Sequence, residues 1–181
     1  MEINKNIFLK GDEIFLRILD NKDIEGNYSI WLNNPEITNY NSHGRFPISS
    51  DQLQSFVNAS KASKSALVLA VVDIKTLMHV GNISLQSINW IDRNAEIAFL
   101  LGEKAYWGKG IMLEAGRLLI DHGFKMLNLH RIYCGTSSDN VGMQRLAEKL
   151  GMIQEGIRIE AIYKKGKYVD VIEYGILSAI R

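Results

Sequence analysis

The sequence predicts an α+β fold built around one mixed, mostly antiparallel sheet. Two observations lead to this prediction. Three apolar runs, at residues 66–73, 80–88 and 95–101, follow one another with only short polar turns between them, which is typical of an antiparallel meander. Helical periodicity comes before and after this meander, rather than between its strands. A strictly alternating, doubly wound fold is therefore not expected.

The first third of the chain is expected to form one strand and two helices. Residues 14–19 alternate loosely between apolar and polar side chains, as a strand does. Asp20 is a suitable cap for a helix with apolar residues at helical spacing, and Pro35 ends that helix. Residues 39–47 are predicted to be a loop, after which a second helix is expected to begin from a cap within residues 49–51.

The rest of the chain completes the sheet. A helix is predicted over residues 110–126, a strand over 131–136, and a shorter helix from Asn140. The last two strands form a hairpin and are expected at residues 157–163 and 168–177. The total is a seven-stranded sheet with about four helices.

Composition favours one ordinary globular domain over residues 1–181. Hydrophobic residues make up 46% of the chain and charged residues 23%. The net charge of +1, without a dense basic block, argues against nucleic acid as a partner. The apolar runs are too short to span a membrane, and no signal peptide is evident at the N-terminus. The single cysteine, Cys134, excludes an intrachain disulfide, so we expect a cytoplasmic protein. The four histidines show no zinc-ligand spacing with Cys134, so no metal is expected.

The segment Gly108-Lys109-Gly110 joins the strand at 95–101 to the helix at 110–126. Glycines at such a junction let main-chain N–H groups approach a ligand, and the helix start favours an anion. The segment is therefore either a diphosphate site or plain loop punctuation. The P-loop motif and the Rossmann dinucleotide fingerprint are both absent from the sequence.

Several short motifs, in this order and spacing, resemble the GNAT superfamily of N-acetyltransferases. The closer resemblance is to the branch of ribosomal-protein-alanine N-acetyltransferases and related small-amine enzymes. The motifs are Trp31-Leu32-Asn33-Asn34-Pro35-Glu36, Val80-Gly81-Asn82-Ile83, Ala95-Glu96-Ile97-Ala98, Tyr106-Trp107-Gly108-Lys109-Gly110, Leu129-His130-Arg131-Ile132, Asn140 with Glu148-Lys149-Leu150-Gly151-Met152, Glu155-Gly156, and Gly166-Lys167-Tyr168-Val169-Asp170-Val171. Together they cover nearly the whole chain.

The resemblance implies that acetyl-CoA is the acetyl donor and that a primary amine is the acceptor. It implies that the fourth and fifth strands of the sheet splay apart and that pantetheine enters between them. Main-chain groups of Phe99, Leu100 and Leu101 would bond the pantetheine, and Asn140 would lie beside it. The diphosphate would be held by N–H groups of a loop formed by Trp107, Gly108, Lys109, Gly110, Ile111 and Met112.

The chain departs from the family pattern at three positions. Met112 replaces a small residue at the end of the loop, so we expect its side chain to turn away from the phosphates. Met143 and Ala147 stand where relatives carry a serine or a tyrosine that protonates the departing CoA thiolate. Neither of these side chains can donate a proton. The alternative function is therefore a catalytically impaired CoA-binding module, and a structural dimer module is a third candidate.

Acetyl transfer needs a group that takes the proton of the attacking amine, and Glu96 is the first candidate for this base. Its alternative role is a solvated glutamate at a strand end. Cys134 and Tyr174 are further catalytic candidates, although a lone strand cysteine or tyrosine more often packs in a core.

The acceptor is expected to be a small amine, an amino sugar or a protein N-terminus. The region between the first two helices walls the acceptor site in the family, so Trp31, Tyr40 and Arg45 are candidates for substrate binding. Arg45 would bind an acidic acceptor, or it is simply a solvated loop residue. Lysines at 164–167 would attract an anionic substrate or provide solubility. An exposed final strand would permit a homodimer.

Overall fold

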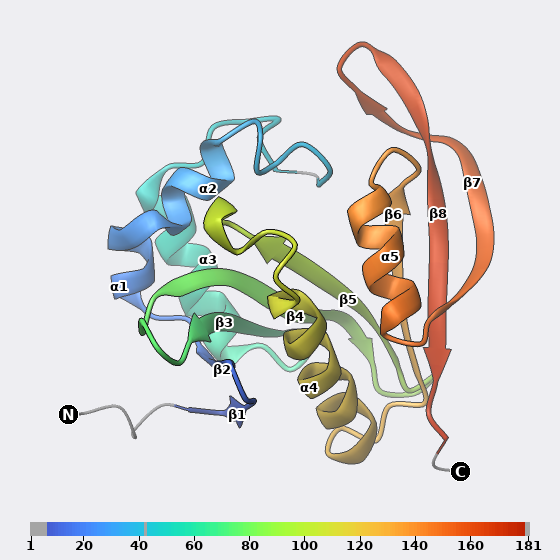
Figure 1. The fold of residues 1–181 in the computed structure, drawn as a ribbon, viewed down its shortest axis with the longest axis horizontal. Coiled ribbons are helices and arrows are strands. Elements are labelled where there is room, and N and C mark those ends of the chain that lie inside the picture. Colours follow the sequence, from blue (N-terminus) through green and yellow to red (C-terminus); the bar gives the residue numbers. More distant parts are fainter. Residues whose placement is uncertain (1–6, 42, 180–181) are drawn as a thin grey trace.

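The computed structural model describes residues 7–41 and 43–179, which form a mixed eight-stranded sheet with helices on both faces (Figure 1). The spatial order of the strands is β1-β2-β3-β4-β5-β6-β8-β7. In chain order the strands are β1 (Leu9–Lys10), β2 (Ile14–Ile18), β3 (Leu67–Asp73), β4 (His79–Asn89), β5 (Asn94–Leu101), β6 (Arg131–Ser137), β7 (Ile153–Lys164) and β8 (Lys167–Leu177). Only the β5–β6 pair is parallel among these strands.

The helices are α1 (Asn21–Asp23), α2 (Ser29–Asn33), α3 (Ser50–Ala62), α4 (Ile111–Lys125) and α5 (Val141–Lys149). A π-helical turn (Ile24–Tyr28) joins α1 to α2, and a 3-10 turn (Lys104–Tyr106) comes before α4. Asp20 caps α1 through a capping box with Asp23, and Ser49 caps α3 through one with Gln52. Each box satisfies two main-chain N–H groups of the first helical turn, which fixes where these helices begin. No helix of the described part of the chain is long and apolar enough to cross a membrane.

The fold class predicted from the sequence is confirmed, with four local differences. The strand β1 was not predicted, because two residues are too few to show a period. The single helix expected after Asp20 is interrupted at Gly26, whose ψ of −146° lies outside the helical region. The strand β7 begins at Ile153, four residues earlier than expected. The last strand, β8, was expected at an exposed edge, but it lies between β6 and β7, so the outer edge is β7.

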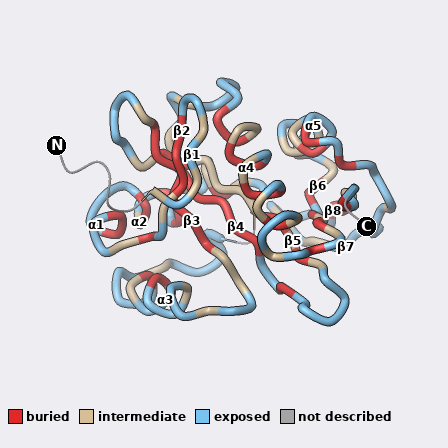
Figure 2. Tube along the Cα trace, turned by 90° about the horizontal axis from the view of Figure 1, so that it is seen from below, coloured by how far each residue is buried: buried red, intermediate tan, exposed pale blue. Residues whose placement is uncertain are grey.

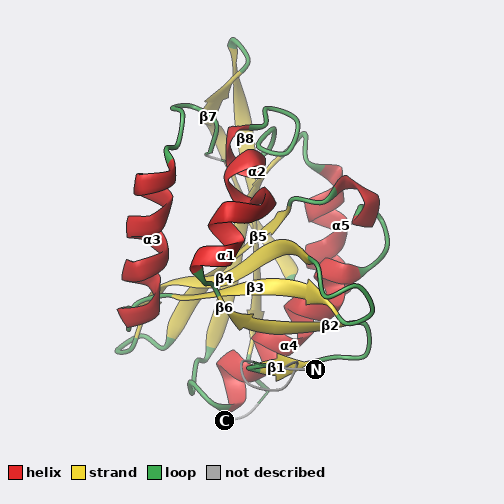
Figure 3. Cartoon of the chain, turned by 90° about the vertical axis from the view of Figure 1, so that its left-hand side faces the viewer, coloured by secondary structure: helices red, strands yellow, loops and turns green. Residues whose placement is uncertain are grey.

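Two apolar clusters hold the helices to the sheet. On one face, which we call the α4 face, α4 and α5 cover a core that includes Leu85, Ile97, Leu119 and Ile132. On the opposite face, the α3 face, α1, α2 and α3 cover a smaller core that includes Leu32 and Val57. Figure 2 shows the buried trace concentrated between these layers, and Figure 3 shows α1, α2 and α3 in front of the strands.

The parallel pairing of β5 with β6 is short. It joins Asn94 to Arg131, Ala95 to Ile132 and Glu96 to Tyr133, and then it stops. Beyond Glu96, β5 continues beside β4, while β6 continues beside β8 up to Ser137. The two strands therefore diverge, as the ribbon in Figure 1 shows. The splayed fourth and fifth strands of the predicted seven-stranded sheet correspond to this pair.

Candidate functional site

A large cleft opens where β5 and β6 separate, with a volume of about 1860 Å³. Its walls come from the loop after α2, the start of α3, β4, β5, β6, α5, the loop before α4 and the β7–β8 hairpin. Of the candidate residues named from the sequence, those that line it are Tyr40, Arg45, Glu96, Phe99, Leu100, Leu101, Trp107, Gly108, Gly110, Ile111, Met112, Cys134 and Asn140. Trp31, Lys109 and Tyr174 do not line it.

The loop before α4 presents free main-chain N–H groups to the cleft. Gly108 and Gly110 have φ values of +74° and +82°, the left-handed region that glycine adopts without strain. Within the described chain, no intramolecular acceptor is found for the amides of Gly108, Gly110, Ile111 and Met112. These amides add to the positive end of the α4 dipole, so the loop is suited to an anionic ligand such as a diphosphate.

Side chains around this loop hold it in place through contacts within the protein. The indole Nε1 of Trp107 donates a hydrogen bond of 3.1 Å to the carbonyl of Leu101, which ties the loop to the end of β5. The side chain of Met112 is buried, and a Cβ built on Gly81 would lie 2.6 Å from its Cε. Met112 therefore points into the core, as expected for a residue turned away from the phosphates. The ammonium of Lys109 lies over the ring of Tyr106.

Beyond Glu96, the edge of β5 that faces β6 has no strand partner, because their pairing ends at that residue. An unpaired strand edge carries main-chain N–H and C=O groups that can bond an extended ligand as a further strand would. Asn140 lies across the cleft at the start of α5, where its Oδ1 accepts a hydrogen bond of 3.1 Å from the amide of Met143. Arg145 and Lys149 of α5 also line the cleft, and neither forms an ion pair among the described residues.

Glu96 lies at the point of divergence and projects to the α3 face. Its neighbours Ala95 and Ile97 are buried in the core of the opposite face, and strand residues alternate between faces. Burial raises the pKa of Glu96; the positive charge of Arg158 opposes this shift and the negative charge of Glu173 adds to it. The net shift is upward, so this carboxyl group is a stronger base than an ordinary exposed glutamate.

The two other catalytic candidates are packed in the core of the α4 face. Cys134 is 2% exposed, and its Sγ lies 3.8 Å from the Sδ of Met152. Burial, together with the negative charges of Glu96 and Glu173, raises the pKa of the Cys134 thiol to about 12, so the reactive thiolate is disfavoured. Tyr174 is 3% exposed, and burial raises the pKa of its hydroxyl. These surroundings favour the packing alternative for both residues.

A row of polar side chains on β4 was missed by the sequence analysis. Asn82, Ser84 and Gln86 line the cleft on the α3 face, beside Leu100, Ala98 and Glu96 of β5 respectively. The signal was present, because these residues alternate with Gly81, Ile83 and Leu85 at the period of a strand. A polar face on an interior strand indicates a ligand or a buried network.

A buried network of hydrogen bonds and ion pairs ends at Asn82 of this row. The guanidinium of Arg17 donates hydrogen bonds of 2.7 and 2.6 Å to the carboxylate of Asp23, which is 4% exposed. The same carboxylate lies 3.2 Å from Nδ1 of His79, whose Nε2 lies 2.8 Å from Oδ1 of Asn82. Burial alone would raise the pKa of Asp23, but the contacts with Arg17 and His79 outweigh it and hold that pKa well below its usual range. The Nδ2 of Asn82 has no close hydrogen-bond partner among the described residues, although the hydroxyl of Tyr28 interacts with this side chain.

Trp31 belongs to the same layer and fills core space rather than the cleft. Its ring packs against Gly102, where an added Cβ would lie 1.9 Å from Cδ2 of Trp31, and its Nε1 donates a hydrogen bond to Glu103. Within the described residues, no group of three His, Cys, Asp or Glu side chains is placed to hold a metal ion.

Proteins similar in sequence to this chain are described as acetyltransferases. A family model described as an acetyltransferase (GNAT) domain matches residues 13–153. The spermidine N(1)-acetyltransferase of Vibrio cholerae is 28% identical over 167 residues, covering 92% of this chain and 94% of that protein. A probable N-acetyltransferase of Bacillus subtilis, YjcK, is 41% identical over 100 residues, and this match covers 55% of each protein.

The solved structures agree with the sequence comparison. A crystal structure of the Vibrio cholerae spermidine N-acetyltransferase in complex with CoA and spermine has a TM-score of 0.84 to this chain. The match has 28% sequence identity and covers 92% of this chain and 96% of that one. The splayed strands, the glycine loop and these matches lead to one conclusion: the chain belongs to the GNAT family and is an N-acetyltransferase.

Proposed function

We propose that the protein transfers the acetyl group of acetyl-CoA to a primary amine by direct attack within a ternary complex. The observation that carries the proposal is the divergence of β5 and β6 directly after Glu96, together with the amides of Gly108, Gly110, Ile111 and Met112 past the other end of β5, for which the described residues offer no acceptor. This arrangement gives CoA a strand edge for its pantetheine and an anion site for its diphosphate. Arg145 and Lys149 of α5 add positive charge on the opposite side of the cleft for the CoA phosphates.

The acceptor amine approaches from the α3 face, where Glu96 lies. Its nitrogen attacks the thioester carbonyl, a C–N bond forms, the C–S bond breaks, and CoA leaves as a thiolate that gains a proton. Glu96 accepts the proton that the amine nitrogen loses, directly or through one water molecule. A raised pKa suits this role, because a general base works best when its pKa approaches the operating pH.

The acetylated product is an amide. Acetyl-CoA is proposed as the donor of the acetyl group because the compared crystal structure contains CoA. The expected acceptors remain a small amine, an amino sugar or a protein N-terminus. The spermidine N-acetyltransferases among the relatives support a small amine.

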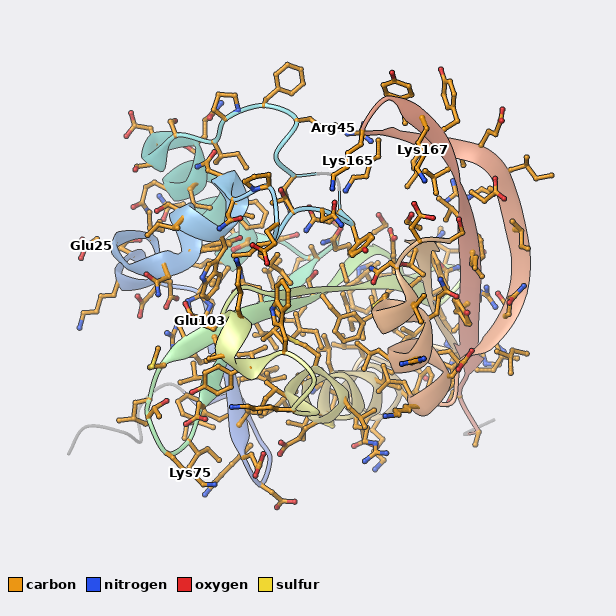
Figure 4. All side chains as sticks on the ribbon, turned by 45° about the horizontal axis from the view of Figure 1, so that its top comes forward. Glu25, Arg45, Lys75, Glu103, Lys165 and Lys167 are labelled. Atoms are coloured by element: carbon orange, nitrogen blue, oxygen red, sulfur yellow. The ribbon has the colours of Figure 1, made fainter. Side chains whose placement is uncertain are left out.

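The experiment that tests the base is the pH dependence of acetyl transfer by a Glu96→Gln variant. We expect kcat/KM to fall by roughly a hundredfold or more, the usual contribution of a general base, with little change in the affinity for acetyl-CoA. The acidic limb of the wild-type profile should lie above the ordinary glutamate pKa and should be absent in the variant. Glu25→Gln is the matched control, because Glu25 is exposed and does not line the cleft (Figure 4). Turnover and a pH profile unchanged by Glu96→Gln would show that Glu96 is not the base.

A second candidate function is a CoA-binding module with impaired catalysis. The observation that favours it is the absence of a hydroxyl at two positions of α5: Met143 lines the cleft, and Ala147 is fully buried in the core. Thermal stabilisation by CoA, without acetyl transfer to any amine tested, would support this candidate over an active transferase.

A further inference from the structure

The mouth of the cleft on the α3 face is closed by two segments that are far apart in the sequence. The loop after α2 meets the tip of the β7–β8 hairpin, and the contacts are polar. A guanidinium nitrogen of Arg45 lies 3.5 Å from the carbonyl of Tyr163. The ammonium of Lys164 donates hydrogen bonds to the carbonyls of Thr38, at 3.0 Å, and Asn39. Figure 4 shows Arg45 beside Lys165 at this junction.

The charges at the mouth are not balanced by carboxylates. Arg45 and Lys164 both line the cleft, and among the described residues neither lies within 4.0 Å of an acidic side chain. Three other basic residues nearby are paired: Lys104 with Glu36, Arg158 with Glu173, and Lys167 with Asp139.

The two cations also act on each other. Burial lowers the pKa of Lys164, and the neighbouring positive charges of Arg45 and Lys165 lower it further. Like charges held together cost free energy, and a bound anion removes that cost by pairing with both. Arg45 keeps most of its five N–H donors for such a ligand, because among the described residues its one hydrogen bond is a long one to a carbonyl.

The floor of the same half of the cleft is polar and carries one carboxylate. Asn82, Ser84 and Gln86 line it without formal charge, and Glu96 lies at the splay point. The Nδ2 of Asn82 is buried and has no close hydrogen-bond partner among the described residues, apart from its interaction with the hydroxyl of Tyr28. A ligand long enough to span this half would therefore have a carboxylate at the splay point, neutral hydrogen-bonding groups along the floor and cations at the mouth.

From this arrangement we infer that the acceptor is a small primary amine that also carries an anionic group, a carboxylate or a phosphate, held by Arg45 and Lys164 at the mouth of the cleft. This inference rests on the proposed acetyl transfer and specifies its acceptor. A polyamine fits poorly, because its further ammonium groups would face Arg45 and Lys164. The acceptor thus differs in charge from the spermine bound in the compared crystal structure.

The test is steady-state acetylation of matched amines that differ in one charged group. Glucosamine and glucosamine 6-phosphate form the phosphate pair, β-alaninamide and β-alanine form the carboxylate pair, and spermidine is the polycation. We expect the anionic member of at least one pair to have a kcat/KM about tenfold or more above its neutral partner, chiefly through KM, and spermidine to be the poorest substrate. The pair with the larger ratio identifies the anion. The preference should weaken as salt is added, because salt screens the exposed charges.

Substitutions at Arg45 and Lys164 test whether these residues cause the preference for anionic amines. Arg45→Gln and Lys164→Gln should each raise KM for the anionic amine by about tenfold and leave KM for the neutral partner within about twofold. Lys167→Gln is the matched control, because Lys167 belongs to the same hairpin but is paired with Asp139 and does not line the cleft. Arg45 is exposed, so its variant keeps the fold even if the loss of the Lys164 contacts disturbs the hairpin.

The outcomes separate this inference from the function on which it rests. Equal or better use of the neutral amines or of spermidine, with acetyl transfer intact, overturns the anionic acceptor and leaves the transferase standing. A preference for anionic amines that survives both substitutions also overturns the assignment to Arg45 and Lys164. Binding of CoA without transfer to any amine in the panel overturns the proposed function, and the inference with it.

Discussion

The buried carboxylate of Asp23 provides a sharp test of how this fold is stabilised. In Asp23→Asn the shape of the side chain is kept, but its negative charge is removed from beneath Arg17 and His79. The native carboxylate receives two hydrogen bonds from Arg17, at 2.7 and 2.6 Å, and one of 2.9 Å from the amide of Asp20. The side chain of Asp23 is 3% exposed and that of Arg17 is 17% exposed, so water replaces the lost partner poorly.

The expected loss of folding stability in Asp23→Asn follows from these exposed fractions. Removing one partner of a buried ion pair destabilises a protein by about 3–5 kcal/mol, because the remaining charge is left unpaired. The residual exposure of Arg17 places the cost near the low end, about 3 kcal/mol. For a chain of this length, that corresponds to a fall in Tm of roughly 6–12 °C.

The effect should depend on pH in a definite direction. The pKa of Asp23 is held well below its usual range in the folded protein. The stabilisation that the ionised carboxylate gives the folded state is therefore fully present above the unfolded pKa of about 4. The contribution is lost as pH falls through the folded pKa. The difference in stability between the wild type and Asp23→Asn should therefore be largest at neutral pH and should narrow below about pH 4.

The assay is denaturant and thermal unfolding of both proteins at neutral and acidic pH. Asp121→Asn is the control, because Asp121 and Lys125 form an exposed pair, 58% and 60% exposed, that is expected to contribute about 0.3–0.5 kcal/mol. If Asp23→Asn lowers the free energy of unfolding at neutral pH by no more than the control does, the buried ion pair does not stabilise the fold as expected. A difference that does not change on acidification would refute the linkage.

Two further predictions concern the cleft. Gly110→Ala should cost about 1 kcal/mol of stability and weaken acetyl-CoA binding in calorimetry, because an alanine strains the φ of +82° that aims the loop amides. Gly166→Ala, also at φ +82° with no atom within 4 Å of the added Cβ, should cost the same and leave CoA binding unchanged. Equal CoA affinities in the two variants would count against an amide-lined diphosphate site. Cys134→Ala should lower stability by about 1 kcal/mol and keep turnover within about threefold, whereas a hundredfold loss in a folded variant would place the thiol in the chemistry.

The sequence was informative about the fold because hydrophobic periodicity is a local property. The core strands from β2 to β6 and the long helix α4 were located to within a few residues by their apolar spacing. The interruption at Gly26 was missed, because a glycine within a helical pattern is usually tolerated. The position of β8 inside the sheet was missed because strand order depends on pairings that no local pattern specifies.

The two halves of the site differed in how well they could be predicted. The proposed CoA half is formed by one continuous stretch, β5, the glycine loop and the start of α4, so its motif and its geometry coincide. The acceptor half is assembled from distant segments: the contact between Arg45 and Tyr163 spans 118 positions, and that between Lys164 and Thr38 spans 126. The sequence indicated Arg45 and the lysines at 164–167 separately, but local spacing does not reveal that they meet.

The end of β5, where the indole of Trp107 caps the carbonyl of Leu101, has a consequence for how the site tolerates substitution. From there to the start of α4, the groups proposed to face CoA belong to the polypeptide backbone, which every residue carries. Side chains along this stretch can drift in evolution as long as the strand and the two left-handed glycines keep their conformation. The proposed acceptor site depends instead on individual side chains, Arg45 and Lys164 among them, so a single replacement there is expected to change which amine is preferred.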